Sequence, residues 1–413
     1  MKPGYKQTDV GVIPEDWEVR SIGEMFQLNN GFPFKPEDWK QSGTPIIRIQ
    51  NLNDRHAAFN YSQAPVSERN RVDAGDLLFA WSGTLGTSFG ARVWTGPSGV
   101  LNQHIFKVLM DEQRITLPFS LLVFAGVERN IAKQAHGFKA SFVHVKKSDL
   151  VKVKLPVPPL PEQHAIATAL DDVNALLDAL ERFITKKRDL KQAAMQQLLT
   201  GKTRLPGFRG EWCTKTVKAI VETPVTDGPH VTPNFVDDGI PFLSVNNLID
   251  NTVDLEDLRF ISQSDHDLFS RKCKPQKKDI LFGKAASVGK VAIVELDIDF
   301  NIWSPIAMIR VTGEYAARFV YYQLQSADLI GQITLLTNSS SQGNIGMGDI
   351  EKLTLQLPSL CEQQAIAAVL TDMHAELAAL EQRLAKTRDI KQAMMQELLT
   401  GRTRLLAPQE AHA

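Results

Sequence analysis

Two stretches of the chain carry the same periodic pattern of apolar side chains. Between residues 160 and 200 they recur at alternating spacings of three and four, at Leu170, Val173, Leu177, Leu180 and Ile184. Residues 360–400 repeat the pattern, at Leu370, Met373, Leu377, Leu380 and Leu384. This spacing is typical of the a/d seam of a coiled coil. The pattern therefore predicts two long helices that pair with each other.

Proline and glycine set the limits of these predicted helices. Prolines at 156, 158, 159 and 161 predict an extended approach to the first helix. Ser359 and Glu362 have the spacing of a capping box at the start of the second. Gly201 and Gly401 fit the position just after a helix end. About 39 residues at ~1.5 Å each would give a rod of roughly 58 Å. The seam thins after Ile184, where Lys187 and Lys191 take apolar positions.

The regions between the helices have a different pattern. Their apolar runs are short and rich in β-branched residues, and Gly, Pro and Asn separate them, which predicts strands joined by loops. Helical patches are expected at 118–134 and 314–330. Each region is therefore expected to be a mixed α and β domain, and the whole chain to be α+β.

The chain is a duplicated unit. Residues 160–205 align with 360–405 without a gap, and 28 of 46 positions are identical. A weaker echo links PIIRIQNLND (45–54) with PFLSVNNLID (241–250). We therefore expect two similar domains, each followed by a spacer helix and then a short tail: 1–155, 156–204, 205–355, 356–405 and 406–413.

Chain order predicts the direction of the helices. The first helix leaves domain one and ends at domain two, whereas the second begins where domain two ends. If the seams pair, the helices must be antiparallel, and the molecule becomes a dumbbell with an approximate two-fold axis. The string LLTGKTRL (198–205) looks like part of a phosphate-binding loop, but the first glycine of that motif is replaced by Gln196, and the string returns as LLTGRTRL. We interpret both strings as helix exits, not nucleotide sites.

Composition narrows the class of protein. The chain has 413 residues, 43% hydrophobic and 23% charged, with a net charge of −1. It has no apolar run near the ~18–20 residues of a membrane span, and its N-terminus has no signal-peptide core. Three widely spaced cysteines argue against a disulfide framework and favour a reducing cytoplasm. No zinc-binding pair of motifs is present, so no metal is expected.

Two unequal domains on a rigid spacer suit the reading of two separated sites on one DNA duplex, which repeats every ~34–36 Å. Side chains that bind base edges or phosphates are Arg, Lys, Asn, Gln, His and Ser. In domain one the candidates are Lys35, Arg48, Asn51, Arg55, Arg92, Gln103, His104, Lys139 and Ser141. In domain two they are His230, Asn246, Asn247, Lys284, Lys290, Ser339, Ser340, Ser341, Gln342 and Asn344. For Asn51 and Asn247 the alternative is turn capping, a common role of Asn.

Several repeated strings resemble those of a known family. The resemblance lies in the leader LPVPPLPEQHAIA (155–167), the exits QQLLTGKTRL and QELLTGRTRL, the opening VIPEDWEV and the segment PGFRGEW. Together they resemble the specificity subunit of type I restriction–modification systems. The resemblance implies that each variable domain is a target recognition domain that reads one half of a split, asymmetric DNA sequence. The paired helices would then act as a ruler for the gap.

The resemblance also implies partners. Two modification subunits, which bind S-adenosylmethionine and methylate adenine, would dock on the helices, and restriction subunits with translocase and nuclease activity would complete the complex. The specificity chain itself would hold no cofactor and catalyse nothing. In agreement, the sequence has no N-P-P-[YF] or D-P-P-[YF] string of an adenine methyltransferase.

Two other readings remain open on the sequence. One is a stand-alone methyltransferase or nuclease with a divergent site, for which Asp38-Trp39-Lys40 is too short a pattern to count as support. The other is a protein scaffold that binds no DNA. Charge bears on the DNA hypothesis, because residues 206–350 carry 13 Lys and Arg against 18 Asp and Glu. Since affinity for DNA comes largely from neutralised phosphates, we expect the isolated chain to bind DNA weakly and to need its partners.

Overall fold

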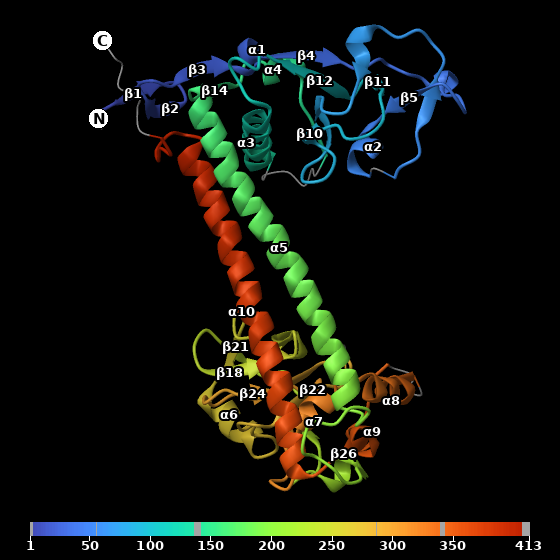
Figure 1. Cartoon of the computed structure of the whole chain (residues 1–413). Helices are drawn as coiled ribbons and strands as arrows, with labels where there is room; N and C mark the ends of the chain where they lie inside the picture. Colours follow the sequence, from blue (N-terminus) through green and yellow to red (C-terminus); the bar gives the residue numbers. More distant parts are fainter. Residues whose placement is uncertain (1–2, 55, 136–141, 286, 339–342, 407–413) are drawn as a thin grey trace. The chain divides into compact units, whose positions relative to one another are not determined.

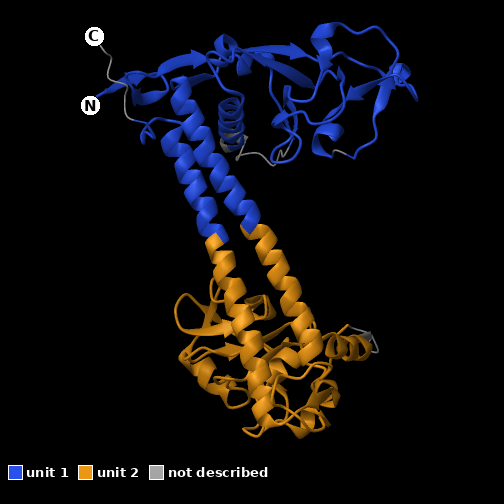
Figure 2. Cartoon of the chain, viewed as in Figure 1, with its two compact units in different colours: residues 1–179, 384–413 blue, residues 180–383 orange. Residues whose placement is uncertain are grey.

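The structure is a computed structural model, and it describes residues 3–54, 56–135, 142–285, 287–338 and 343–406. The chain divides into two compact units (Figure 2). Unit 1 comprises residues 1–179 and 384–413, and unit 2 comprises residues 180–383. Both boundaries fall inside long helices, so each unit contains part of each helix.

The two long helices match the prediction closely (Figure 1). α5 spans Leu160–Leu198 and α10 spans Leu360–Leu398, 39 residues each. Gly201 and Gly401 follow them with φ of 68° and 69°, the left-handed geometry that terminates a helix and that glycine adopts without strain. Pro161 was predicted to lie in the extended approach, but it lies in the first turn of α5. Its missing N–H costs no helical hydrogen bond there.

In unit 2 the two helix segments run in opposite directions. Lys187 Nζ lies 2.6 Å from Glu376 Oε1, and Lys191 Nζ lies 3.0 Å from His374 Nδ1. Further along α5, Leu198 shares a hydrophobic core with Leu370. Residue numbers therefore rise along α5 as they fall along α10. The polar partners on α10 also explain how lysines can occupy positions of the apolar seam.

Unit 1 contains the other ends of the same helices, again antiparallel. Ile166 and Leu170 of α5 share a hydrophobic core with Met395 and Leu398 of α10. Over both units, the seam residues that are buried are Leu170, Leu177, Leu180, Ile184, Leu370 and Leu377, and those that are half-buried are Val173, Met373, Leu380 and Leu384. The predicted antiparallel seam is confirmed within each unit.

The main body of unit 1 is built on two four-stranded sheets. The first is antiparallel, in the order β10 (Gly90–Val93), β8 (Leu77–Ala80), β12 (Ile105–Met110) and β4 (Phe26–Asn30). The second has the order β6 (Asn60–Ser62), β5 (Thr44–Ile47), β11 (Gly99–Leu101) and β7 (Arg71–Val72), with β5 and β11 parallel. Helix α3 (Leu117–Ala135), which matches the predicted patch at 118–134, packs on the first sheet. There Phe124 lies 5.1 Å from Phe79, measured between ring centroids.

Shorter elements complete unit 1. A hairpin of β1 (Tyr5–Thr8) and β2 (Gly11–Pro14) begins it, and β3 (Glu18–Ser21) pairs with β14 (Lys154–Val157) next to the start of α5. A third pair joins β9 (Ser82–Thr84) to β13 (Phe142–His144). The short helices are α1 (Ile22–Met25), η1 (Pro36–Asp38), α2 (Ile49–Asn53), η2 (Glu68–Asn70) and α4 (Lys147–Leu150).

Unit 2 repeats the first sheet, and its second sheet shares three strands in the same order but has its fourth strand at the opposite edge. Its first sheet has the order β16 (Thr226–Asp227), β25 (Ile306–Ile309), β22 (Ile280–Gly283) and β23 (Val291–Ile293). Its second has the order β17 (Phe235–Val236), β21 (Arg259–Ile261), β18 (Ile240–Leu243) and β24 (Asn301–Ile302), with β18 and β24 parallel. The remaining elements are β15 (Cys213–Thr216), η3 (Val217–Ala219), η4 (Val245–Asn247), β19 (Leu248–Ile249), β20 (Thr252–Val253), α6 (Gln263–Ser270), α9 (Met347–Lys352) and β26 (Thr354–Leu357).

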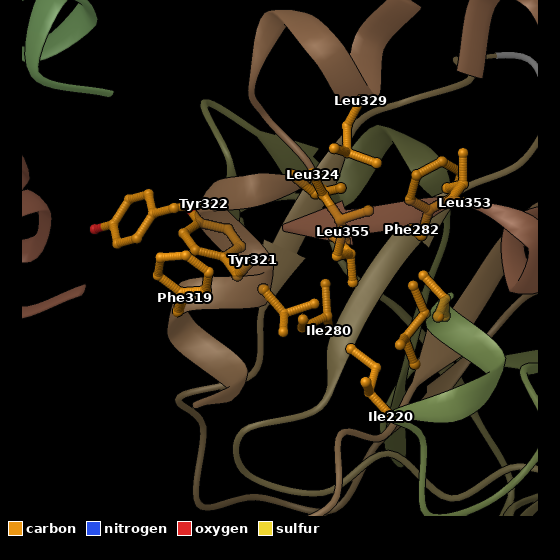
Figure 3. Close-up of a cluster of buried hydrophobic side chains, with 14 of the residues drawn as sticks. Ile220, Ile280, Phe282, Phe319, Tyr321, Tyr322, Leu324, Leu329, Leu353 and Leu355 are labelled. Carbon is orange, nitrogen blue, oxygen red and sulfur yellow. The ribbon is translucent and has the colours of Figure 1, made fainter. Parts of the chain in front are cut away.

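The main core of unit 2 lies between its first sheet and its helices (Figure 3). Ile280 and Phe282 of β22 pack there with Phe319 and Tyr322, all almost fully buried. The predicted single helix at 314–330 is instead two, α7 (Ala317–Gln323) and α8 (Ala327–Asn338). Ser326 causes the break, because its Oγ accepts from Leu329 N and starts a new helix.

Candidate nucleic-acid interface

In unit 1, several loops are tied together at one end of the first sheet. Phe32 N donates to Leu101 O at 2.7 Å, which holds the loop 31–43 against the end of β11. Trp81, just after β8, donates its backbone N–H to the backbone carbonyl of His104 at 3.3 Å. Val145 N in turn donates to Trp81 O at 2.9 Å. We call the segments 31–43, 48–50, 81, 102–104 and 145 the loop face of unit 1.

Unit 2 has the same arrangement with different side chains. Ser304 N donates to Pro229 O at 3.2 Å, and Lys284 N donates to Pro305 O at 2.8 Å. Ile345 N donates to Lys284 O at 3.0 Å. Lys284 therefore occupies the place that Trp81 occupies in unit 1. The loop face of unit 2 comprises 228–239, 244–246, 284, 303–305 and 345.

Glycine begins the first loop in each face because the chains approach too closely for a side chain. A Cβ on Gly31 would overlap the carbonyl oxygen of Asn102, and a Cβ on Gly228 would overlap that of Ile302. Asn102 directly follows β11, and Ile302 is the last residue of the equivalent strand, β24. The same backbone geometry thus supports two loops of unrelated sequence.

In unit 1 the loop face carries rings and hydrogen-bonding groups. A hollow of about 260 Å³ is lined by Arg48, Ile49, Gln50, Asn102, His104 and Ile105. The Arg48 guanidinium lies 4.6 Å from the centre of the Trp39 ring and donates to Asn60 Oδ1 at 2.8 Å. Gln103 Nε2 lies 3.4 Å from His104 Nε2. Within the described residues, His104 Nδ1 and Trp81 Nε1 are shielded from solvent and have no hydrogen-bond partner. The face therefore contains two polar atoms whose hydrogen-bonding capacity is unused.

In unit 2 the loop face carries an ionic cluster around Asp227. Lys272 Nζ lies 2.6 Å from Asp227 Oδ1, while Lys284 Nζ and His230 Nε2 lie 3.0 and 3.2 Å from Oδ2. The Asp227 side chain is fully buried. Burial raises its pKa, but the hydrogen bond from Lys272 and the ion pair with Lys284 outweigh this, so the pKa lies below its usual range. The carboxylate is therefore charged and holds the cations in place.

Asn51 and Asn247, both predicted to contact DNA, have surroundings that favour the alternative role of turn capping. Asn51 Oδ1 accepts from Arg48 N and its Nδ2 donates to Ala57 O at 3.1 Å. Asn247 Oδ1 likewise accepts from Ser244 N, and its Nδ2 donates to Asp257 O at 3.0 Å. Their exposed fractions are 3% and 6%. Since each amide is buried and bound to local backbone, neither can reach a base edge in this structure.

The other predicted residues have varied surroundings. Lys35 is exposed on the unit 1 loop face, and Asn246 is exposed at the position equivalent to Gln50. Lys290 is exposed beyond β22, and Asn344 is half-buried next to Ile345. Arg92 is half-buried on β10, where burial lowers its pKa despite nearby Glu128. Seven candidates lie outside the described residues: Arg55, Lys139, Ser141, Ser339, Ser340, Ser341 and Gln342.

Sequence reasoning missed two members of the Asp227 cluster. Lys272 follows α6, far along the chain from the loop 228–239, and Asp227 looks like an ordinary turn residue before Gly-Pro. No periodicity or motif links them, so a local pattern could not have found them.

Within the part of the chain that the structure describes, no group of three or more His, Cys, Asp or Glu could hold a metal ion. Nor do the described residues include a helix long and apolar enough to cross a membrane.

Comparisons with known proteins agree with this two-unit architecture. The family model described as "Type I restriction modification DNA specificity domain" matches residues 14–192 and 231–387. The EcoBI specificity subunit of Escherichia coli is 25% identical over 94% of this chain and 86% of its own length. The MjaVIII specificity subunit of Methanocaldococcus jannaschii is 23% identical over 95% of this chain and 94% of its own. A crystal structure of the specificity subunit from M. genitalium covers 97% of this chain and 99% of its own, with a TM-score of 0.58 and 16% identity.

Proposed function

We propose that this chain, which belongs to the type I restriction modification DNA specificity family, selects the DNA target of such a complex with its two units. It is the specificity subunit, and the chemistry resides in other subunits. The observation that carries the proposal is the pair of loop faces, which share one backbone framework but carry different side chains. Two such readers suit a bipartite, asymmetric target.

The loop faces supply the chemistry of DNA recognition. In unit 1 we propose that Arg48, Gln103 and His104 contact DNA around the hollow, with Lys35 on the exposed loop beside it. Arg, Gln and His offer the donors and acceptors that distinguish base edges in the major groove. In unit 2 the candidates are His230, Asn246, Lys284, Lys290 and Asn344. Arg92 and the seven candidates outside the described residues stay predictions of the same kind.

Two hollows support a pair of identical partner subunits. One, of about 420 Å³ in unit 1, is lined by the last turns of α10 together with α3. The other, of about 910 Å³ in unit 2, is lined by the last turns of α5 and the α7–α8 region. The same four residue types line both: Gln192, Met195, Gln196 and Thr200 in unit 2, and Gln392, Met395, Gln396 and Thr400 in unit 1. One kind of partner segment could therefore dock twice.

We propose that these partners are two modification subunits that carry S-adenosylmethionine, and that restriction subunits join the full complex. The chain would act in the cytoplasm, where its three cysteines (Cys213, Cys273 and Cys361) stay free. Because the second domain is net acidic, the modification subunits would supply much of the grip on DNA, and the isolated chain would bind weakly.

The test is to map methylated adenines in cells that express this chain with its modification subunits. Combined substitution of Gln103 and His104 by Ala should change or abolish one half of the methylated sequence and leave the other half intact. Asn246→Ala should affect only the opposite half. Lys277→Gln is the control, since Lys277 precedes β22 at the end away from Lys284 and pairs with exposed Asp297.

Three outcomes would contradict the proposal. Methylation by the purified chain alone would indicate a stand-alone enzyme. An unchanged target in all loop-face variants would remove the loop faces from recognition. A complex that methylates without any sequence preference would favour a scaffold role.

A further inference from the structure

The Asp227 cluster contains more positive than negative charge. One buried carboxylate faces two lysines and a histidine. Among the described residues, no second carboxylate lies within ion-pair distance of Lys272, Lys284 or His230. Asp227 can balance one lysine, so the cluster keeps at least one net positive charge. The surplus is available to an anion.

Two members of the cluster face solvent. The side chains of His230 and Lys272 are 67% and 47% exposed, whereas that of Lys284 is 16% exposed and Asp227 beneath them is fully buried. Lys272 Nζ uses one donor on Asp227 and another on Gly228 O at 3.0 Å. An ammonium has three donors, which leaves one for an outside acceptor. The cluster therefore presents donors to solvent from a fixed base.

The surroundings make this local charge significant. Residues 206–350 carry 13 Lys and Arg against 18 Asp and Glu, so this segment has a net charge of −5, which disfavours a polyanion. Charge distribution, not the net sum, decides where an anion approaches. The cluster lies on the loop face, where the first loop begins at Gly228. It is thus a place where unit 2 can accept a phosphate.

Among its described residues, unit 1 has no counterpart of the cluster. Asp227 pairs with Ala307 of β25, and the equivalent pairing in unit 1 is Asn30 with Phe106 of β12. Lys284 corresponds to Trp81, whose ring lies 5.7 Å from that of Phe106 and 5.3 Å from that of His104. The same two places therefore hold an amide and an indole in unit 1, but a carboxylate and an ammonium in unit 2.

We propose that Asp227 is a positioning residue that holds Lys272, Lys284 and His230 as a binding site for one phosphate of the DNA backbone, which anchors unit 2. This deepens the proposed function and rests on it. A phosphate fits better than a base edge because its oxygens accept from several converging donors and its charge complements the surplus. A phosphate contact adds affinity and fixes orientation but conveys no sequence.

Salt dependence is the test that separates a phosphate contact from a base contact. The complex of this chain with its modification subunits is titrated with a duplex containing its target, at several salt concentrations. For the double variant K272Q/K284Q we expect the slope of log K against log salt to fall in magnitude by about 0.9, the value for one phosphate. H230Q, at a largely exposed position, should lower it by less. Lys277→Gln makes the same charge change off the loop face and should leave the slope unchanged.

A second measurement tests whether Asp227 acts through the lysines. Asp227→Asn should weaken binding and lower the slope in the wild-type background, because the lysines lose their fixed base. In the K272Q/K284Q background the same substitution should have no further effect on the slope. A purely structural role would instead weaken binding equally in both backgrounds. Melting temperatures of all variants show whether a loss of binding comes from unfolding.

The outcomes separate this inference from the proposed function. If the wild-type complex binds its target specifically but the variants keep the full slope, the phosphate site is wrong and the specificity role stands. If the variants change the methylated sequence while the slope is unchanged, the cluster reads a base instead. If the wild-type complex has no sequence preference, both proposals fall.

Discussion

Arg404 and Glu162, which lie 242 positions apart, form an ion pair through two contacts in unit 1. Arg404 Nε donates to Glu162 Oε1 at 3.0 Å and its NH2 nitrogen to Oε2 at 2.6 Å. Trp17 Nε1 also donates to Glu162 Oε2, at 2.9 Å. In unit 2, Arg204 binds Glu362 in the same two-contact way. The arginine of each helix exit thus pairs with the glutamate that begins the other helix, which explains why both strings are repeated.

This relationship predicts a large loss of stability from Arg404→Ala. The Glu162 side chain is 2% exposed, so the substitution leaves a buried carboxylate without its ion-pair partner. Breaking a buried pair on one side costs about 3–5 kcal/mol. We expect a loss of that size in the free energy of unfolding of unit 1, measured by denaturant titration.

Arg402→Ala is the matched control for Arg404→Ala. The Arg402 side chain is 67% exposed and 3.8 Å from Glu397, and exposed pairs contribute about 0–1 kcal/mol. Comparable losses from the two substitutions would show that the Arg404–Glu162 pair is not the stabilising element that its burial indicates.

A second prediction concerns the start of the unit 2 loop face. In Gly228→Ala, the new Cβ would overlap Ile302 O, so the loop or β24 must shift. We expect a lower melting temperature and weaker DNA binding by the complex.

Gly331→Ala in α8 is the comparison, because its Cβ would meet no atom within 4 Å. Alanine in a helix is favoured over glycine by roughly 0.5–1 kcal/mol, so this variant should be as stable as the wild type or more so. A neutral Gly228→Ala would contradict the close approach.

The sequence predicted the helices well because their signals are local and periodic. The spacing of Leu170, Leu177 and Ile184 indicates one apolar face, and Gly201 marks where the helix ends. Chain order alone then required antiparallel pairing. The mixed strands of each domain followed from short apolar runs. The break at Ser326 was missed because a serine inside an apolar helical stretch does not show from sequence whether its side chain caps a new helix.

The site was harder to predict because its residues are brought together by the fold. Lys284 and His230 were chosen as candidates by residue type, but their convergence on Asp227, and the part of Lys272, depend on strand order in three dimensions. Asn51 and Asn247 show a second limit of residue type. Their residue type suits base recognition, yet the hydrogen bonds of their amides are used by neighbouring backbone, and that assignment is invisible in a single sequence.

The capping role of Asn51 gives a third prediction. Asn51→Ala removes an acceptor for Arg48 N and a donor for Ala57 O, and leaving such groups unpaired costs about 1–3 kcal/mol. We expect lower stability of unit 1 but an unchanged methylated sequence. Asn247→Ala should do the same in unit 2. A variant that keeps its stability but methylates a different sequence would return these residues to the set of base contacts.

The last prediction concerns pH and the helix seam of unit 2. His374 Nδ1 lies 3.0 Å from Lys191 Nζ. Burial and, next, the positive charge of Lys191 lower the pKa of His374 below 6.5, while Glu381 opposes the shift and Arg318 adds to it. In the unfolded chain His374 has its ordinary pKa, so on acidification the unfolded state takes up this proton first. Stability should therefore decline as pH falls from about 6.5 through the lowered pKa of the folded state.

The aligned residue of the first helix is Asn174, which makes His374→Asn the natural test. Melting temperatures between about pH 5 and 8 should show a smaller decline on acidification in this variant than in the wild type. Parallel declines in the two proteins would mean that His374 does not titrate differently in the folded seam.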